Sequence, residues 1–125
     1  MKKVISTELA PAAIGPYAQA VATGDLVITS GQLPINPATG AFPEGIAEQT
    51  RQSLENVKAI LAQAGTGMDR IIKTTVFLSD MNNFGAMNEV YATFFTEGNY
   101  PARSAVEVAR LPKDALVEIE VIAAL

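Results

Sequence analysis

The longest regular pattern in the chain is an apolar stripe between residues 46 and 64, and it constrains the fold more than any other feature. The residues that recur at steps of three and four are Ile46, Thr50, Leu54, Val57 and Leu61. This spacing places them on one face of an amphipathic helix, and that face must be buried against another layer. Gly65 follows directly and is typical of a helix C-terminus. The stripe predicts a helix over 46–64 that packs on a sheet.

Short runs rich in β-branched residues supply that sheet. The central one, "IIKTTVFLS" at 71–79, is apolar on both faces. Gly24-Asp25 separates two apolar runs and is typical of a hairpin turn. The predicted strands cover residues 2–6, 17–22, 26–30, 71–79, 103–110 and 116–124.

A second helix is predicted after Asp80 and ends near Phe95, because apolar residues again share one face: Phe84, Met87, Tyr91 and Phe94. The order β-β-β-α-β-α-β-β predicts an α+β fold with one domain over residues 1–125. We expect a mixed six-stranded sheet with both helices on one face. The other face, where Glu118 and Glu120 fall, must then meet water or another subunit.

The composition excludes several kinds of chemistry. The chain has no cysteine and no histidine, so disulfides, thiolate nucleophiles, zinc fingers and histidine bases are excluded. Thirteen acidic residues outnumber nine basic ones, and Lys2-Lys3 is the only basic cluster, so nucleic acid is disfavoured as a partner. With no apolar run long enough for a bilayer and no secretory signal pattern, we expect a cytoplasmic protein.

Arg103 lies at the start of a predicted strand, two residues after Pro101. A guanidinium is a planar fork of donors that matches a carboxylate in shape and charge. Arg103 is therefore a candidate ligand for a substrate carboxylate. The alternative is a structural ion pair or a solvated charge at the edge of the sheet.

Five other residues are candidates for a site, each with a structural alternative. Glu118 alternates with apolar residues, and a carboxylate in a partly apolar cleft can orient or deprotonate water. The alternative is a solvent-facing strand residue. Ser30 and Gly31 end a strand and offer a hydroxyl and an open backbone to a ligand, or they simply form a turn. Tyr17, after a Gly-Pro pair, and Asn88, on the second helix, are either ligand contacts or structural residues.

The segment "PARSAVEVARLPKDALVEIE", residues 101–120, resembles the C-terminal signature of the Rid family of reactive intermediate deaminases, also called the YjgF family. Four earlier segments resemble the same family in the same order: "AIGPYAQAV", "VITSGQLPINPATG", "QTRQSLENVKAIL" and "KTTVFLSDMNNFGAMNEVY". The resemblance covers essentially the whole chain. It implies a chorismate-mutase-like fold and a homotrimer whose sheets line a central barrel, with active sites between subunits.

The resemblance also implies an activity, the hydrolysis of 2-imino acids such as 2-iminobutanoate and 2-iminopropanoate to 2-keto acids and ammonia, without a metal or organic cofactor. By this resemblance Arg103 binds the substrate carboxylate. Glu118, rather than Glu120, is the glutamate associated with the attacking water, and Tyr17 is the pocket tyrosine.

Four further positions carry over from the same resemblance. Ser30 and Gly31 match the Ser-Gly pair that lines the site, where the glycine carbonyl accepts from the imine nitrogen. Asn88 matches a cleft asparagine. Ala105 stands where many close relatives carry cysteine, so only a backbone N–H is available there and thiol-based regulation is lost. The loop "TEGNYPARS" is slightly shorter than in close relatives, which predicts an altered pocket rim and a changed preference for substrate size.

Two other functions stay open from the sequence. A module that binds small carboxylates without catalysis needs Arg103 equally, because a fold does not determine a function. Family members have also been described as ribonucleases or translation inhibitors. The acidic charge balance argues against that role here.

Overall fold

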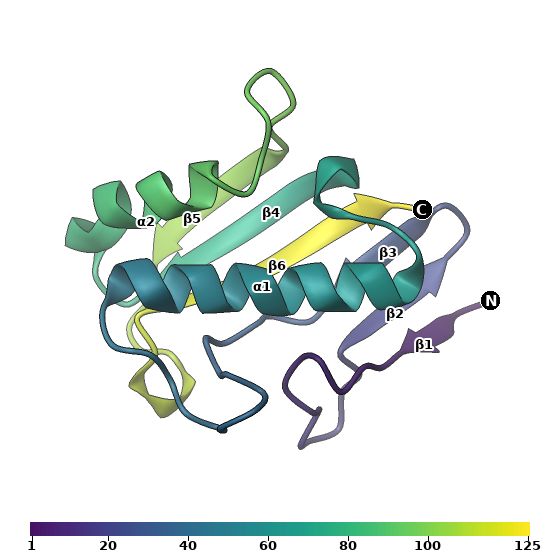
Figure 1. Ribbon diagram of the computed structural model, residues 1–125, viewed down its shortest axis with the longest axis horizontal. Helices are drawn as coiled ribbons and strands as arrows, with labels where there is room; N and C mark the ends of the chain where they lie inside the picture. Colours follow the sequence, from purple (N-terminus) through teal and green to yellow (C-terminus); the bar gives the residue numbers. More distant parts are fainter.

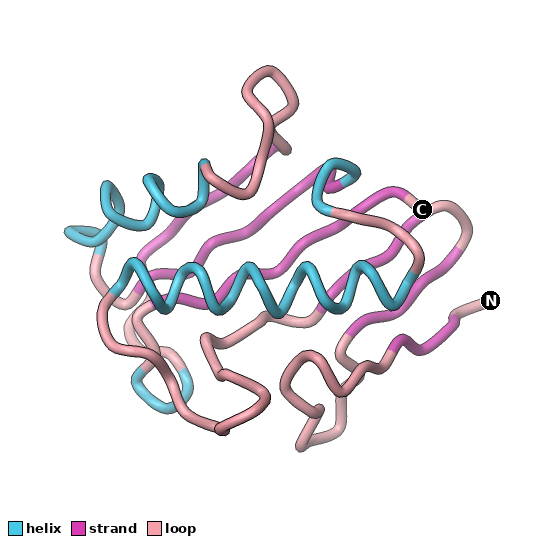
Figure 2. Tube along the Cα trace, in the orientation of Figure 1, coloured by secondary structure: helices cyan, strands magenta, loops and turns pink.

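Two helices lie on one face of a six-stranded sheet (Figure 1). The computed structural model describes residues 1–125. The strands are β1 (Lys3–Ile5), β2 (Ala20–Thr23), β3 (Leu26–Thr29), β4 (Ile71–Leu78), β5 (Ala102–Glu107) and β6 (Val117–Ala124). The helices are α1 (Ile46–Ala64) and α2 (Phe84–Ala92). Figure 2 shows both helices on the same side of the strands, as the sequence predicts.

The sheet is mixed, which confirms the predicted class. Its strand order is β1-β2-β3-β6-β4-β5. Only β4 and β5 are parallel neighbours, and α2 forms the crossover between them. All other neighbours are antiparallel, including β2 and β3, which are joined by the predicted Gly24-Asp25 hairpin. Gly24 has a φ of 56°, a left-handed conformation that glycine adopts at little cost.

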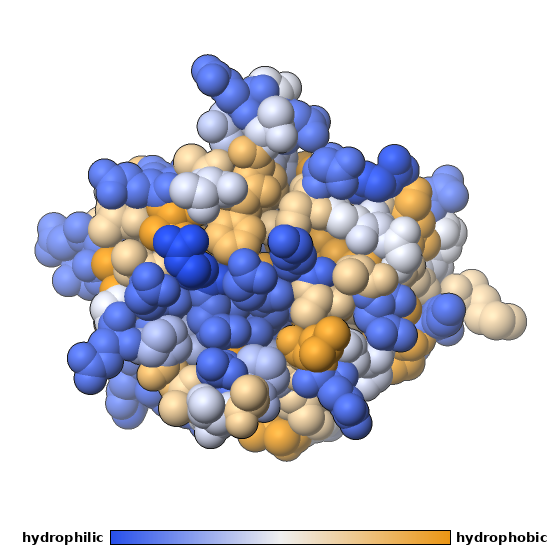
Figure 3. All heavy atoms as spheres, viewed as in Figure 1, coloured by the Kyte–Doolittle hydropathy of each residue, from blue (hydrophilic) through white to orange (hydrophobic).

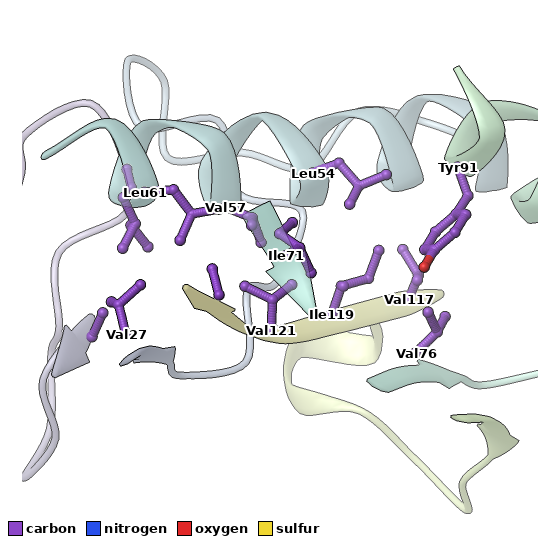
Figure 4. Packing of buried hydrophobic residues seen from close by; sticks show 14 of the residues in the cluster. Val27, Leu54, Val57, Leu61, Ile71, Val76, Tyr91, Val117, Ile119 and Val121 are labelled. Atoms are coloured by element: carbon purple, nitrogen blue, oxygen red, sulfur yellow. The ribbon is translucent and has the colours of Figure 1, made fainter. Parts of the chain in front are cut away.

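The hydrophobic core lies between α1 and the sheet. Leu54, Val57 and Leu61 of the predicted helical stripe are fully buried. They pack toward the alternate residues of β6, Val117, Ile119 and Val121 (Figure 4). The outer side of α1 is covered largely by hydrophilic residues (Figure 3). Neither helix combines the length and apolarity that crossing a bilayer requires.

Three predicted boundaries differ from the structure by three residues, and most of the other strand ends differ by one. The second strand begins at Ala20 instead of residue 17, because the chain turns tightly where the Tyr17 N–H donates to the Gly15 carbonyl. The fifth strand ends at Glu107 because its partner β4 ends at Leu78. α2 ends at Ala92 instead of Phe95, since the following amides bond three residues back in a tighter turn.

The sheet face turned away from the helices has no cover within the chain. Alternation along β6 places Glu118 and Glu120 on this open face. Apolar side chains also lie there and are part-exposed, among them Ile28 at 40% and Val106 at 43%. β5 is an edge strand, so it also leaves one row of backbone groups unpaired.

Polar residues on α1 hold the long loop of residues 32–45 in place. The Asn56 side chain is 1% exposed and donates to the carbonyls of Leu33 and Ile35, at 3.1 and 2.9 Å. Gln49 donates to the Pro43 carbonyl and accepts from the Leu116 amide. This clamp matters because the loop forms part of a cavity wall.

We expect Asn56→Ala to lower the free energy of unfolding by about 1–3 kcal/mol, because two part-buried carbonyls lose their only side-chain donor. The measurement is urea denaturation at one protein concentration. Gln52→Ala is the matched control, since Gln52 donates only to the Asn56 side chain and is part-exposed. Equal losses in both variants would contradict the clamp.

Candidate functional site

The candidate residues divide between two hollows. The first, here called the Glu118 pocket, is a cavity of about 440 Å³ whose lining includes Tyr17, Ser30, Gly31 and Glu118. The second, the Arg103 pocket, measures about 470 Å³ and is lined by Asn88, Tyr91, Ala92, Tyr100, Pro101 and Arg103. The sequence groups these residues in one site, whereas a single chain separates them.

The Glu118 side chain lies against the bare backbone of Gly31. A Cβ on Gly31 would sit 2.8 Å from Glu118 Cδ and 2.9 Å from its Oε2. The two segments are held together by Gln32, which pairs with Ile119 through backbone hydrogen bonds of 2.7 and 3.2 Å. Only glycine permits this approach, so Gly31 is needed for close contact and not for a positive φ.

Burial raises the pKa of the Glu118 carboxyl above its ordinary value, and the nearby Glu120 carboxylate adds to the effect. Partial removal from water disfavours the charged form, and a second negative charge does the same. A carboxyl with these neighbours binds a proton more readily than a surface glutamate does. Such a group is suited to exchanging a proton with a water molecule.

The other walls of the Glu118 pocket come from loops. The Ser30 hydroxyl donates to the Ala18 carbonyl at 2.6 Å, so its oxygen keeps lone pairs to accept from a ligand. Tyr17 is 52% exposed at the rim, and its hydroxyl has no partner within the chain. The Gln19 side chain holds the N-terminal segment against this wall by donating to the Pro11 carbonyl at 2.7 Å.

The Arg103 side chain lies on the helix side of the sheet, because Arg103 is paired in register with the buried Thr74 of β4. Its Nη1 donates to Asn88 Oδ1 at 2.6 Å. The guanidinium carbon lies 4.8 Å from the Tyr91 ring centroid and 5.4 Å from that of Phe84. The two salt bridges of the chain involve other residues, so the alternative of a structural ion pair within one chain is wrong.

Arg103 and Glu118 do not converge within one chain. Arg103 shares the helix face with Thr74, whereas Glu118 pairs with Phe77 on the open face. Ala105 follows Arg103 on the helix face and is partly buried against the core. The sheet therefore lies between the two groups.

Sequence reasoning missed several residues that line these pockets or lie beside the Arg103 guanidinium. Phe84 and Tyr91 were assigned only to a buried helical face, although their spacing with Asn88, four and then three residues, places all three on one stripe. Lys113 lines the Glu118 pocket and has a φ of 55°, and Asp114 has a φ of 56°. Aspartate adopts the left-handed conformation more often than most residues, whereas lysine does not, and no sequence pattern indicates two such residues in succession.

Glu118 should make stability depend on pH. Its folded-state pKa lies above the ordinary value of 4.5, so the folded chain holds this proton more tightly than the unfolded chain. The resulting stabilisation is fully present below the unfolded pKa and is lost as the pH rises through the folded pKa. We expect the unfolding free energy of the wild type to fall relative to that of Glu118→Gln over this interval.

The measurement is urea denaturation across the acid range up to neutral pH. Glu55→Gln is the control, because Glu55 is an exposed carboxylate on α1. If the curves of the wild type and of Glu118→Gln stay parallel, the raised pKa is contradicted.

Known proteins match this chain over nearly its whole length. The family model described as Endoribonuclease L-PSP matches residues 7–125. The 2-iminobutanoate/2-iminopropanoate deaminase of Escherichia coli K12 is 59% identical, with 98% of each chain covered. Among solved structures, the E. coli YjgF gene product superposes with a TM-score of 0.94 at 59% identity, covering 98% of both chains. E. coli TdcF with bound serine gives 0.93 at 52% identity, again covering 98% of both.

These matches extend beyond the motifs to nearly every residue. They therefore confirm the resemblance inferred from the arginine segment and the four segments before it. The chain belongs to the Endoribonuclease L-PSP family, which is the Rid or YjgF family that its motifs resemble.

Proposed function

We propose that this protein hydrolyses reactive 2-imino acids, such as 2-iminobutanoate and 2-iminopropanoate, to 2-keto acids and ammonia. The proposal is supported by 59% identity along almost the full length of a curated deaminase of that name. The structural observation that carries it is the Arg103 guanidinium, which has no carboxylate partner in the chain. It is held by the Asn88 side chain and by the rings of two aromatic residues, Phe84 and Tyr91. A half-buried carboxyl with a raised pKa complements it.

The chemistry needs little beyond positioning, because an imine carbon is already electrophilic. Arg103 binds the substrate carboxylate through paired charge-assisted hydrogen bonds. Glu118 accepts a proton from a water molecule while the water oxygen bonds to the imine carbon. Return of that proton to the nitrogen gives a carbinolamine, in which one carbon carries both a hydroxyl and an amino group. Glu118 then transfers the hydroxyl proton to the nitrogen, the C–N bond breaks as the C=O bond forms, and ammonia leaves. Holding the reactants in this geometry supplies much of the rate enhancement.

The remaining candidates orient the substrate. The Gly31 carbonyl accepts from the imine nitrogen, and the Ser30 oxygen and the free Tyr17 hydroxyl bind the reacting end or its water. Asn88 fixes Arg103 through its carbonyl and keeps its amide donors for the ligand. Ala105 contributes its backbone N–H near the carboxylate. We propose that the reaction takes place in the cytoplasm and uses no metal or organic cofactor.

We propose a homotrimer of the chorismate-mutase type, whose open sheet faces line a central barrel. Three features support an assembly: the uncovered open face with its part-exposed Ile28 and Val106, the free edge of β5, and the separation of Arg103 from Glu118. A site with both groups requires the Arg103 pocket of one subunit to meet the Glu118 pocket of another.

A non-catalytic module that binds small carboxylates is the second candidate. It is favoured by one observation, the solved structure of the 52% identical TdcF with bound serine. Arg103 serves both functions, whereas only hydrolysis needs Glu118. A ribonuclease activity, which the name of the family model mentions, fits poorly with a net charge of −4.

Arg103→Ala should lower kcat/KM by about 100-fold or more, because the substrate carboxylate loses its charge-assisted bonds. Arg103→Lys should still lose at least about tenfold, since an ammonium cannot reproduce the planar fork. The assay follows keto-acid release from 2-iminobutanoate generated in situ by a threonine dehydratase.

Arg110→Ala is the matched control, because Arg110 is 77% exposed and pairs only with Asp114. Near-normal turnover by folded Arg103→Ala would show that Arg103 is not the carboxylate ligand. A wild type that binds the keto acid but does not accelerate hydrolysis would favour the binding module.

Mixed oligomers test whether the site is shared. Arg103→Ala and Glu118→Gln, each nearly inactive alone, should regain activity when they are co-expressed or refolded together. Random pairing of the two variants leaves about a quarter of the sites with both native groups. The measurement is specific activity of the purified mixture beside each variant alone. A mixture no more active than the two variants assayed separately would mean that both groups of a site come from one chain.

A further inference from the structure

Three side chains on one stripe of α2 surround the Arg103 guanidinium. Phe84, Asn88 and Tyr91 follow one another at steps of four and three residues, so they share one helix face. Asn88 binds Nη1 at the side, at 2.6 Å. The rings of Phe84 and Tyr91 lie within 5.4 and 4.8 Å of the guanidinium carbon. The helix therefore presents a polar contact and two aromatic contacts to one cation.

The Tyr91 ring is itself held firmly. Tyr91 is 5% exposed, and its hydroxyl shares a hydrogen bond of 2.7 Å with the hydroxyl of the fully buried Thr74. On its other side the Phe95 ring packs with a centroid separation of 4.8 Å. Thr74 is also the residue of β4 that pairs in register with Arg103. The ring and the cation are thus fixed to the same point of the sheet.

This arrangement leaves the guanidinium available to a ligand. A cation over an aromatic ring is attracted by the ring electrons without using an N–H donor. Asn88 occupies one of the five donors, and no carboxylate of the chain occupies the others. A free arginine would lose side-chain entropy when it bound a carboxylate, whereas one already held in position loses less.

We propose that Tyr91, locked by Thr74, and Phe84 are positioning residues that hold the Arg103 guanidinium in the orientation that binds the substrate carboxylate. The inference rests on the proposed function, because it assumes that Arg103 is the carboxylate ligand. It assigns the strength of carboxylate recognition to an aromatic platform on α2. Neither ring is required to contact the reacting atoms.

Binding of a matched pair of ligands tests the proposal. The probes are 2-oxobutanoate, the keto-acid product, and 2-oxobutanamide, which has the same shape without the charge. Titration calorimetry compares wild type, Tyr91→Leu, Tyr91→Phe and Phe84→Leu. Phe94→Leu is the control, because Phe94 is a partly buried aromatic residue just after the C-terminus of α2 and does not contact the guanidinium.

We expect wild type and Phe94→Leu to prefer the acid over the amide. Tyr91→Leu and Phe84→Leu should each reduce the affinity for the acid about fivefold to tenfold and change that for the amide less than twofold. Tyr91→Phe keeps the ring and should retain most of the preference. In turnover assays Tyr91→Leu should raise KM more than it lowers kcat, as expected when binding of the carboxylate is weakened uniformly.

Two results would overturn the proposal: an unchanged preference in both leucine variants, or an equal loss of affinity for acid and amide, which indicates general damage to the pocket. If Tyr91→Leu does not fold, Phe84→Leu gives the answer. A wild type with no preference for the acid would instead refute Arg103 as the carboxylate ligand, and with it the mechanism proposed above.

Discussion

Burial of one face of the sheet beneath α1 and α2 is the constraint on which the rest of the structure depends. In β6, strict alternation sends Val117, Ile119 and Val121 into the core. Glu118 and Glu120, which alternate with these residues, must therefore lie on the open face, because successive strand side chains point in opposite directions. Glu118 is thereby placed where the strand end, Gly31 and the neighbouring loops partly remove it from water.

The same constraint separates the two charged groups of the proposed reaction. Arg103 shares the core side with Thr74, so it reaches α2 and its aromatic residues. Glu118 points the other way. A cation backed by rings and a carboxyl with a raised pKa are each well prepared for a ligand, yet one chain cannot bring them to the same substrate. The core between the helices and the sheet is closed within one chain, whereas the proposed site is not, and this difference supports the proposed assembly.

Both pockets depend on elements that carry no chemistry themselves. α1 holds the loop of residues 32–45 through Asn56 and Gln49, which are buried but fully hydrogen-bonded. α2 holds Arg103. The two helices therefore support the two pockets in different ways. α1 holds a loop of the Glu118 pocket through amide hydrogen bonds, and α2 holds the cation of the Arg103 pocket through Asn88 and aromatic contacts. The role of α1 in holding this loop explains why Gln49 and Asn56 occur on its buried face.

Local patterns in the chain were enough to predict the element types and their order, because periodicities of 3.6 and 2 are local properties, and that order in turn indicated a mixed sheet. Contiguous motifs also indicated the family, and they made Arg103, Glu118 and Gly31 candidates for the site. Strand ends shifted because pairing stops where a partner stops, as β5 does beside β4. Three features became visible only in the folded chain: Arg103 lies over the Tyr91 ring, Gly31 contacts Glu118, and the two charged groups lie on opposite faces of the sheet. These are contacts between residues distant in sequence, and they depend on strand register and helix placement, which no local pattern encodes.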